Sequence, residues 1–512
     1  MGWNDWAHYQ CHYTAQTILS NARALVKTGL AARGYDRVTI DDCWMGKTRA
    51  ANGNLQPNAQ RFPHGMKPVA NTVHKLGLHF GIYEDGGYET CAKFAGMGHP
   101  KGGGKAHFFQ DARLFASWDI DYAKLDLCNI QVPPGSTRLA VYHKLYATYR
   151  AALTSTGLPI ILEAPGAFQG TPNYYDMLRW AHLYGQMSRE GTDIEIFRAD
   201  HPDRPRFHSV LWNYAYNLQL GRYQEPDSWD YPDFMIAGDK GLSLAESRSQ
   251  MALWSMMSAP LILSSDVAKL SPQALSIVGN KAVIAIDQDP LGRMATLVSR
   301  TPKTDVLFKR LADGEYAAAV LNRSEAPVKV DLNPAEFGFA ASSRCRLDAK
   351  NLWNGREQSS VSTLQAEVAS HDTTIWRVRA SAQCGMPSRT GTITLTSNVR
   401  THLHTINGYT RCLASPGSVE SCVGTAAERW TVTPDGALRS SGDECLALAH
   451  GKPLLEECRP VKSQHWRYTL RGNLISSTDH QCLSSAGLES EAHLEMQPCG
   501  HNLPNQIWSL PN

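Results

Sequence analysis

Residues 37–42 have the sequence Arg-Val-Thr-Ile-Asp-Asp, a short apolar run that ends in two acids. Residues 122–126, Tyr-Ala-Lys-Leu-Asp, repeat this pattern further along the chain. Between such runs lie amphipathic stretches, such as residues 14–32, which have apolar residues at helical spacing and stop before Gly34. Repeated strand–helix alternation over residues 1–290 predicts a parallel sheet closed into an eight-stranded (β/α)8 TIM barrel. A doubly wound open sheet is the alternative, but no GxGxxG follows the first strand.

Acidic residues follow the C-terminal ends of successive predicted strands. They are Asp41, Asp42, Glu84, Asp85, Asp126, Glu163, Asp193 and Asp233. In a TIM barrel these strand ends meet at one mouth, which is where active sites lie. Because so many carboxylates on one rim would repel each other without a ligand, we interpret this mouth as a binding site.

The chain changes character after residue 290. Residues 291–380 contain short strands separated by turns, which predicts an antiparallel β-sandwich domain. Residues 381–395 are rich in Ser, Gly, Pro and Thr, which indicates a linker or the start of a third unit. The predicted fold class is therefore multidomain, α/β in the barrel and all-β beyond it.

Residues 396–512 contain an internal repeat. Cys-Leu recurs at residues 412–413, 445–446 and 482–483, and each pair is followed by a second cysteine, at positions 422, 458 and 499. Each unit closes on a tryptophan: Trp430, Trp466 and Trp508. Threefold repetition of a short β unit that cannot bury its own core predicts a β-trefoil.

The composition excludes several classes of protein. Lys plus Arg is 50 and Asp plus Glu is 48, so the net charge is +2, which argues against a nucleic-acid binder. No run of apolar residues is long enough for a membrane span. The 19 histidines contain no HExxH, and no Cys/His cluster has zinc spacing, so we expect no metal and no cofactor.

The chain has 12 cysteines, of which seven follow residue 380. An even total, with more than half of the cysteines in a loop-rich region, favours disulfides, with buried free thiols as the alternative. Disulfides imply an oxidising compartment, so we expect a secreted or periplasmic protein. No signal peptide is visible, because the chain opens directly on Met-Gly-Trp-Asn-Asp-Trp, so export would require a signal that has been removed.

Two carboxylates that flank a sugar ring can hydrolyse a glycosidic bond. Asp126 lies two residues after Lys124, whose charge would keep the carboxylate ionised, as a nucleophile requires. Asp193 lies four residues after Arg189 on a later loop. Each acid alone could be a surface residue or a salt-bridge partner, and only their common place at the barrel mouth favours catalysis.

Six motifs carry a more specific resemblance. They lie at residues 1–6, 40–44, 61–66, 81–83, 122–126 and 285–292. Over residues 1–380 the chain resembles the retaining glycoside hydrolase family of α-galactosidases and α-N-acetylgalactosaminidases, also called melibiases. Residues 396–512 resemble the ricin-type β-trefoil lectin module. These resemblances imply hydrolysis of a terminal α-linked galactose from an oligosaccharide or glycan, by double displacement through a covalent glycosyl-enzyme.

The resemblance implies roles for individual residues. Asp126 matches the nucleophile and Asp193 the general acid/base, while Arg189 matches an arginine that contacts the sugar near its 2-position. Asp41 and Asp42 match the pair that hydrogen-bonds the 6- and 4-hydroxyls of a galacto-sugar. Other positions match further residues of the sugar pocket, namely Trp6 as its aromatic platform, Tyr83, Lys124 and Asp233.

The resemblance also implies a set of disulfides. In the barrel, Cys11 would pair with Cys43 and Cys91 with Cys128. In the trefoil, each unit would pair its own two cysteines, as Cys412–Cys422, Cys445–Cys458 and Cys482–Cys499. Cys345 and Cys384 are left free or paired with each other.

Two places depart from the family pattern. Tyr231 stands within the usual Trp-Asn-Asp-Pro-Asp motif, where we expect it to reshape the rim. In the loop after the fifth strand, one alignment places Ala164 and Ala167 where N-acetylgalactosaminidases have two small residues, and another places Glu163 at the sugar's 2-hydroxyl. We favour an α-galactoside as substrate, with α-N-acetylgalactosaminide as the alternative and a β-L-arabinopyranoside or an α-glucan behind them.

Two further alternatives remain. A carbohydrate-binding protein without catalysis is the rival class, but such a protein would have lost Asp126 or Asp193, and both are present. In the trefoil, the aspartate that usually grips sugar hydroxyls is replaced by Ala414, Ala447 and Ser484. Polysaccharide binding and a purely structural role both stay open for this module.

Overall fold

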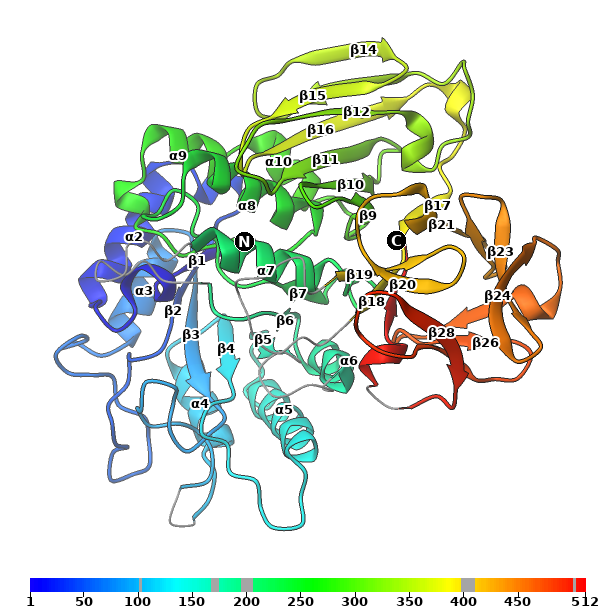
Figure 1. Ribbon diagram of the computed structural model, residues 1–512. Helices are drawn as coiled ribbons and strands as arrows, with labels where there is room; N and C mark the ends of the chain where they lie inside the picture. The colour runs from blue at the N-terminus through cyan, green and yellow to red at the C-terminus, as the bar shows by residue number, and fades with distance from the viewer. Residues whose placement is uncertain (101–103, 167–174, 195–205, 397–409, 501–502) are drawn as a thin grey trace.

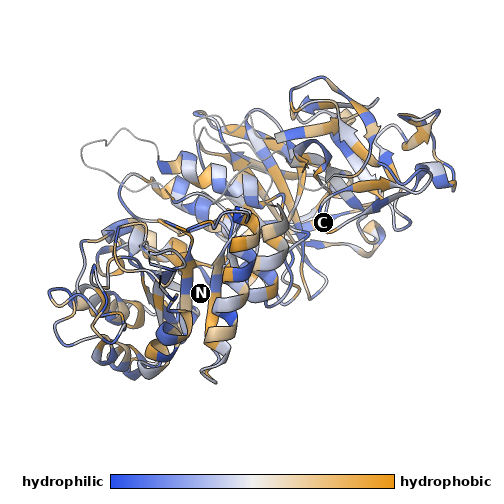
Figure 2. Cartoon of the chain, turned by 90° about the horizontal axis from the view of Figure 1, so that it is seen from below, coloured by the Kyte–Doolittle hydropathy of each residue, from blue (hydrophilic) through white to orange (hydrophobic). Residues whose placement is uncertain are grey.

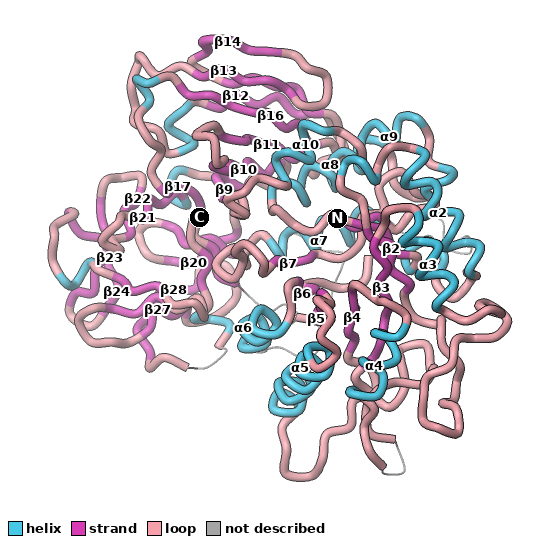
Figure 3. The backbone as a smooth tube through the Cα atoms, turned by 180° about the vertical axis from the view of Figure 1, so that it is seen from behind, coloured by secondary structure: helices cyan, strands magenta, loops and turns pink. Residues whose placement is uncertain are grey.

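The structure is a computed structural model of the 512-residue chain and describes residues 1–100, 104–166, 175–194, 206–396, 410–500 and 503–512. It contains three units (Figure 1): a barrel, a β-sandwich above it, and a trefoil that lies beside both. Figure 3 shows the same arrangement from behind. The predicted multidomain fold of TIM barrel, antiparallel sandwich and trefoil is confirmed.

The barrel sheet is parallel, in the order β7-β6-β5-β4-β3-β2-β1-β8. A parallel bridge between Met235, which follows β7, and Leu263 in β8 joins the two ends of this order. The strands are β1 (Gly2–Asn4), β2 (Arg37–Ile40), β3 (His79–Asp85), β4 (Tyr122–Asp126), β5 (Ile161–Pro165), β6 (Met187–Arg189), β7 (Trp229–Tyr231) and β8 (Ile262–Leu263).

Helices cover the outside of this sheet. They are α1 (Trp6–Tyr9), α2 (Ala15–Lys27), α3 (Lys67–Lys75), α4 (Phe108–Ser117), α5 (Arg138–Thr154), α6 (Tyr175–Tyr184), α7 (Arg206–Asn217), α8 (Leu244–Met256), α9 (Pro272–Val278) and α10 (Lys281–Asp287). Figure 2 shows that hydrophobic and hydrophilic residues alternate along these helices, as expected when one face packs on a sheet. None of the helices in the described part of the chain has the length and apolar character needed to cross a lipid bilayer.

Side-chain alternation along each strand decides which residues can face the mouth of the barrel, which we define as the C-terminal ends of β1–β8. In β4, Ala123 and Leu125 pack in one apolar cluster with Leu145 of α5 and Leu178 of α6. Tyr122, Lys124 and Asp126 therefore point to the barrel interior. One residue of shift would exchange these two sets.

The second unit is a β-sandwich. Its larger sheet has the order β14-β13-β16-β11-β10-β9, and β12 pairs with β15 in a second sheet. Phe308, Phe337 and Trp376 belong to its apolar core. The strands are β9 (Thr296–Arg300), β10 (Thr304–Arg310), β11 (Tyr316–Asn322), β12 (Val328–Leu332), β13 (Leu347–Asn351), β14 (Glu357–Val361), β15 (Leu364–Val368) and β16 (Thr373–Ala380).

The third unit begins earlier than expected. β17 pairs with β21, and β18 pairs with β19 and β29, so residues 389–395 belong to the trefoil and the expected linker over 381–395 is wrong for its second half. The strands are β17 (Arg389–Thr392), β18 (Thr394–Thr396), β19 (Thr410–Ala414), β20 (Ser418–Ser421), β21 (Arg429–Val432), β22 (Leu438–Ser440), β23 (Glu444–Ala449), β24 (Lys452–Glu457), β25 (Trp466–Tyr468), β26 (Leu474–Ser476), β27 (Cys482–Ser485), β28 (Ala492–Gln497) and β29 (Trp508–Ser509).

The repeat in sequence corresponds to a repeated contact in the trefoil core. The indole N–H of Trp430 donates to the carbonyl oxygen of Leu413 at 2.8 Å, and Trp466 donates to Leu446 at 2.8 Å. Trp508 donates to the carbonyl oxygen of Leu483 at 2.9 Å. Each tryptophan therefore ties the end of its unit to the Cys-Leu strand at the start of that unit, which explains why both motifs recur together.

All 12 cysteines are paired. The five pairs implied by the family resemblances are present, two in the barrel and three in the trefoil. Cys345 and Cys384 form the sixth disulfide, within the β-sandwich, which selects one of the two alternatives left open for them.

The trefoil is docked tightly against the other two units. Ile507 belongs to the apolar cluster that holds Trp212 and Tyr216 of α7. The backbone N–H of Asn512 donates to the Oγ1 of Thr296 in β9 at 2.9 Å. At Gly391 a Cβ atom would lie only 2.6 Å from the carbonyl oxygen of Leu297, so only glycine permits this approach of β17 to β9.

Candidate active site

The centre of the mouth is Asp126, the last residue of β4, which is 8% exposed. Its Oδ1 accepts the backbone N–H of Leu127 at 2.9 Å. The hydroxyl of Tyr83 lies 3.2 Å from Asp126 Oδ2 and 3.3 Å from Asp85 Oδ2, so it can donate to either carboxylate. Burial raises the pKa of Asp126, and the cations Arg189 and Lys124 counteract that effect.

Asp193 is the more open carboxylate of the site, with a side chain that is 65% exposed. Its Oδ1 accepts a hydrogen bond from Arg189 Nη1 at 2.6 Å. Partial withdrawal from bulk water raises the pKa of Asp193, but the guanidinium outweighs it, so this pKa lies below its ordinary value. Asp126 also feels the charge of Asp193, so the two acids share one electrostatic environment.

A second ion pair lies across the mouth. Lys124 Nζ is 2.6 Å from Asp41 Oδ2, and the Nδ2 of Asn4 donates to the same oxygen at 2.8 Å. The backbone N–H of Asp41 donates to Asp5 Oδ1 at 2.7 Å. Burial lowers the pKa of Lys124, but Asp41 outweighs it, and the net shift is upward, so the lysine stays charged.

Asp42 is held by backbone donors. Its Oδ1 accepts the N–H of Cys43 at 2.6 Å, and its Oδ2 accepts the N–H of Ala92 at 2.9 Å. Burial raises the pKa of Asp42 to about 6. The donor Cys43 and the residue before the donor Ala92, Cys91, belong to the two barrel disulfides, so each disulfide fixes a loop at the mouth.

Asp233 lies in the loop after β7 and completes the group of charged side chains at the mouth. Its Oδ2 accepts the N–H of Ile194 at 2.7 Å, and its Oδ1 lies 3.8 Å from Arg189 Nη1. Burial raises the pKa of Asp233 to about 6. Its φ of 72° is in the left-handed region, and a non-glycine residue there is held by its surroundings. The bond to Ile194 couples it to the segment that carries Asp193.

Trp6 lies at the start of α1, directly after β1. Its backbone N–H donates to the side chain of Asn4 at 2.8 Å, and Asn4 in turn donates to Asp41. The indole is half-buried and packs on the barrel core. This placement leaves part of the ring available to a ligand.

The loop after β5 differs from one of the two alignments considered above, and the other, with Glu163 at the sugar's 2-hydroxyl, stays a prediction. Ala164 is fully buried in the apolar cluster between the sheet and the helices, with Tyr146 and Leu178, so the expectation that it lines the sugar pocket is wrong. Alternation turns its side chain to the outer face of the sheet. Ala167 lies outside the described residues.

Glu163 points inward at the level of its register partner Lys124, and the hydroxyl of Tyr122 donates to its Oε2. The next inward residue at the strand end is Pro165, which pairs in register with Arg189. The motif alignments overlooked Pro165, although period-two alternation from Glu163 identifies it.

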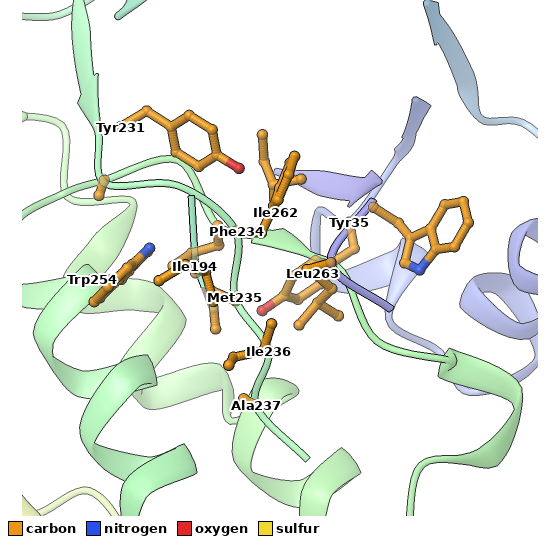
Figure 4. Close-up of a cluster of buried hydrophobic side chains, with 14 of the residues drawn as sticks. Tyr35, Ile194, Tyr231, Phe234, Met235, Ile236, Ala237, Trp254, Ile262 and Leu263 are labelled. Carbon is orange, nitrogen blue, oxygen red and sulfur yellow. The ribbon is translucent and has the colours of Figure 1, made fainter. Parts of the chain in front are cut away.

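Tyr231 also differs from the expectation. Its side chain is fully buried and does not reshape the rim. Figure 4 shows the ring inside the barrel, near Ile262 and Phe234. The register that pairs Tyr231 with Arg189 turns both side chains inward.

One cluster near the mouth has the elements of a metal site: Asp85, Cys91, Asp126 and Cys128 have ligand atoms within 4.8 Å of one another. Its two sulfurs are joined in a disulfide, so no thiolate is available to a metal. Cys91 Sγ lies 3.4 Å from Asp126 Oδ2, so this disulfide packs directly against the carboxylate. The expectation of a site that needs no metal or cofactor stays a prediction.

Comparisons with known proteins agree with this geometry. The family described as Alpha galactosidase A matches residues 1–289, its C-terminal β-sandwich domain matches 301–378, and the ricin-type β-trefoil lectin domain matches 400–508. The chain is 35% identical to Alpha-galactosidase A of Aspergillus niger, over 100% of this chain and 91% of that protein. It is 32% identical to the alpha-galactosidase of Cyamopsis tetragonoloba, over 72% of this chain and 84% of that protein.

A solved structure shows the same similarity. Alpha-galactosidase I of Mortierella vinacea superposes with a TM-score of 0.65 and 25% identity, over 75% of this chain and 97% of that chain. The family match covers more than half of the 512 residues, and the chain belongs to the alpha galactosidase A (melibiase) family of glycoside hydrolases.

Proposed function

We propose that the protein is a retaining exo-α-glycosidase that removes terminal α-linked galactose from oligosaccharides or glycans. The observation that carries this proposal is a single mouth that holds Asp126 and Asp193, with Arg189 bonded to Asp193 and its charge acting on Asp126. Two carboxylates with unequal surroundings are what double displacement at a glycosidic bond requires. The family match and the Aspergillus relative support the galactoside as substrate.

In the first step, the Asp126 carboxylate attacks the anomeric carbon. The bond between this carbon and the leaving oxygen breaks, and Asp193 gives its proton to that oxygen. In the second step Asp193 takes a proton from water, the water oxygen attacks the anomeric carbon, and the ester bond to Asp126 breaks. Tyr83 favours the ionised nucleophile by donating a hydrogen bond to it.

Arg189 has to change partner during this cycle. Its bond to Asp193 holds that carboxylate ionised, which suits the base of the second step but not the acid of the first. If the guanidinium turns to a sugar hydroxyl, as the family resemblance implies, Asp193 loses its counter-charge and its pKa rises. Substrate binding would then prepare the acid.

The Lys124–Asp41 pair and Asp42 supply the acceptors for a galacto-sugar. The carboxylates of Asp41 and Asp42 accept the backbone N–H groups of Asp42 and Cys43, so their free lone pairs are fixed before the sugar arrives. We assign them to the 4- and 6-hydroxyls, Lys124 to the same end of the sugar, and Trp6 to the apolar face of the ring. Asp233 acts beside Arg189.

N-acetylgalactosaminide is less well supported, because Ala164 is turned away from the mouth. The decisive assay compares nitrophenyl α-galactoside with nitrophenyl α-N-acetylgalactosaminide, and β-L-arabinopyranoside completes the panel. We expect kcat/KM to favour the galactoside by at least about 100-fold. The Asp126→Asn variant serves as control for contaminating activity. Equal or faster cleavage of the acetamido substrate would overturn the assignment.

We infer that the protein works outside the cytoplasm, secreted or periplasmic, because the structure pairs all 12 cysteines. Its partner is the carbohydrate substrate itself. The test is the redox state of the protein recovered from its native compartment. Six intact disulfides are expected, whereas free thiols would argue for the cytoplasm.

For the trefoil we infer a structural role. The three positions where a sugar-gripping aspartate is expected hold Ala414, Ala447 and Ser484, which are at most 4% exposed. Ser484 Oγ already accepts a hydrogen bond from Gln506 at 3.0 Å. None of the three offers a free carboxylate to a sugar. The docking through Ile507 and Asn512 gives the module a function as a brace instead.

A further inference from the structure

Asn213 of α7 is a buried amide that the proposed hydrolysis does not use. It is 0% exposed. Its Oδ1 accepts the backbone N–H of Thr192 at 3.1 Å, and its Nδ2 donates to the carbonyl oxygen of Thr192 at 2.9 Å and to that of Pro232 at 2.9 Å. Because an amide has one carbonyl oxygen and two N–H donors, these bonds use all of its polar groups on the backbone of two loops. We call this set of bonds the Asn213 clip.

The two loops that the clip joins carry charged groups of the mouth. Thr192 directly precedes Asp193, the proposed acid/base, and Pro232 directly precedes Asp233. On the other side of Asp193, the N–H of Ile194 donates to Asp233 Oδ2 at 2.7 Å. The backbone of Asp193 is therefore held at both neighbouring residues, and its side chain projects from a fixed point.

The sequence favours the close approach of α7 to residues 190–192. At Gly191 a Cβ atom would lie 2.6 Å from Asn213 Oδ1, so a larger residue would push on the clip. One turn further along α7, the Nδ2 of Asn217 donates to the carbonyl oxygen of Glu190. Because residues at i and i+4 of a helix lie on one face, α7 presents two amides to the segment before the acid/base.

The helix that carries the clip is itself anchored next to it. The hydroxyl of Tyr214 donates to Asp305 Oδ2 at 3.1 Å. Asp305 belongs to β10 of the sandwich, is 0% exposed and accepts two hydrogen bonds from Arg300, at 2.8 and 2.6 Å. A carboxylate bonded to arginine in this bidentate way is fixed in direction as well as in distance. We therefore regard α7 as a rigid support for the clip.

We propose that Asn213 is a positioning residue for the hydrolysis, which holds Asp193 where it can exchange a proton with the leaving oxygen and with water. The inference rests on the proposed function and deepens it. The side chain of Asp193 is 65% exposed, and the proposed cycle breaks its bond to Arg189, so the backbone then decides which points the carboxylate can reach. Proton transfer needs heavy atoms about 2.6–3.2 Å apart, and a shift of about 1 Å can cost about 100-fold in rate.

The proposal predicts which substrates are affected. A displaced acid slows the first step most when the leaving oxygen cannot depart without a proton, as in an alkyl α-galactoside. A nitrophenyl α-galactoside needs that proton much less. The ratio of kcat/KM for the nitrophenyl substrate to kcat/KM for the alkyl substrate should therefore rise when the clip is weakened. Because this substrate ratio does not depend on the fraction of folded enzyme, a purely structural defect leaves it unchanged.

The test uses the full chain and two variants that weaken the clip from opposite sides. Asn213→Asp keeps the size of the side chain and its acceptor but removes the donors to the two carbonyl oxygens. Gly191→Ala keeps Asn213 and forces its amide to move. We expect the substrate ratio to rise by about tenfold or more in Asn213→Asp and by a smaller factor in Gly191→Ala. The melting temperature of each variant confirms that it folds.

A second background shows whether the effect passes through Asp193. In Asp193→Asn the acid is already lost, so adding Asn213→Asp should leave the substrate ratio of Asp193→Asn unchanged within about twofold. This lack of additivity separates a positioning role from damage elsewhere in the mouth.

The matched control is Asn322→Asp in the sandwich. Asn322 is also 0% exposed, its Oδ1 accepts the N–H of Ser324 at 2.9 Å, and its Nδ2 donates to the carbonyl oxygens of Ala326 and Val368 at 2.8 and 3.1 Å. The exchange thus removes the same kinds of bond in another unit of the protein. The melting temperature should fall as in Asn213→Asp, while the substrate ratio stays that of the unmodified protein.

Three results would overturn the inference. They are an unchanged substrate ratio in whichever of Asn213→Asp and Gly191→Ala folds, an equal rise in Asn322→Asp, and an equal further rise in the Asp193→Asn background. Failure of the proposed function would instead appear in the unmodified protein, as an absence of turnover with both galactosides.

Discussion

The mouth of the barrel and the trefoil both belong to folds that bind sugars, but they differ in the charged residues that they contain. The mouth holds carboxylates paired with Arg189 and Lys124. At the three positions where a sugar-binding aspartate is expected, the trefoil has small uncharged side chains. Its core, held by the tryptophan hydrogen bonds, is intact. The difference shows that a fold persists through its core contacts, whereas function depends on a few polar residues that can be lost separately.

The two regions also differ in how they are held. The mouth is fixed by hydrogen bonds from backbone N–H groups and by two disulfides. The trefoil is fixed by close apolar and backbone contact with α7 and β9. Changes at the mouth should therefore alter turnover, and changes at the trefoil should alter stability.

The largest expected effect belongs to Asp126. Asp126→Asn keeps the shape of the side chain but removes the nucleophile, so kcat should fall by at least about 10⁴-fold. Steady-state assays with nitrophenyl α-galactoside measure it, and an unchanged melting temperature serves as control. Turnover near the original rate would show that another group attacks the sugar.

The next effect belongs to Asp193 and depends on the leaving group. In Asp193→Asn, an alkyl α-galactoside should lose about 10²- to 10⁴-fold in kcat/KM, because its leaving oxygen needs a proton. The nitrophenyl substrate, whose leaving group needs little help, should lose much less in its first step. Equal losses for both substrates would contradict the acid role.

The trefoil offers the contrasting test. Ile507→Ala should destabilise the protein by about 2–4 kcal/mol, because it leaves a cavity against Trp212 and Tyr216. Urea unfolding followed by tryptophan fluorescence measures it, and kcat of the folded variant should stay unchanged. Leu488→Ala, at a trefoil leucine that is 39% exposed, is the matched control and should cost less than about 0.5 kcal/mol. A large loss of kcat in folded Ile507→Ala would contradict a separation of the two regions.

The smallest effect is expected for sugar binding by the trefoil, where we predict no binding. A chain with Asp41→Asn and Asp126→Asn lacks the proposed acceptor and nucleophile of the mouth. Calorimetry should then detect no saturable binding of galactose. Binding that survives in this double variant would place a sugar site on the trefoil and break the comparison.

Much of the fold follows from the sequence because its signals are periodic. The strand ends at Asp41 and Asp126 and the repeated Cys-Leu and Trp positions mark elements that are regular in space. The pairing of Cys345 with Cys384 could not be predicted, because these residues are 39 positions apart and no repeat or motif links them. The docking of Ile507 on α7 depends on contacts between distant parts of the chain, which no local pattern records.

The residues of the candidate site could also be predicted only in part from the sequence. Motif matching located Asp126, Asp193 and Arg189, because their neighbours form distinctive sequences. It misplaced Ala164, because an alignment by residue type does not fix which face of a strand a side chain occupies. Because side chains alternate along a strand, Pro165, two residues after Glu163, lies on the same inward face and could have been identified from the sequence.

The central claim is that Asp126 forms a covalent bond to the sugar. A dinitrophenyl α-galactoside can be turned over, quenched with acid, and the protein digested and analysed by mass spectrometry. The account predicts one hexosyl group on the peptide that contains Asp126, and none when Asp126→Asn is treated in the same way. A hexosyl group on a different residue would contradict it, as would release of galactose with inverted configuration and no labelled peptide.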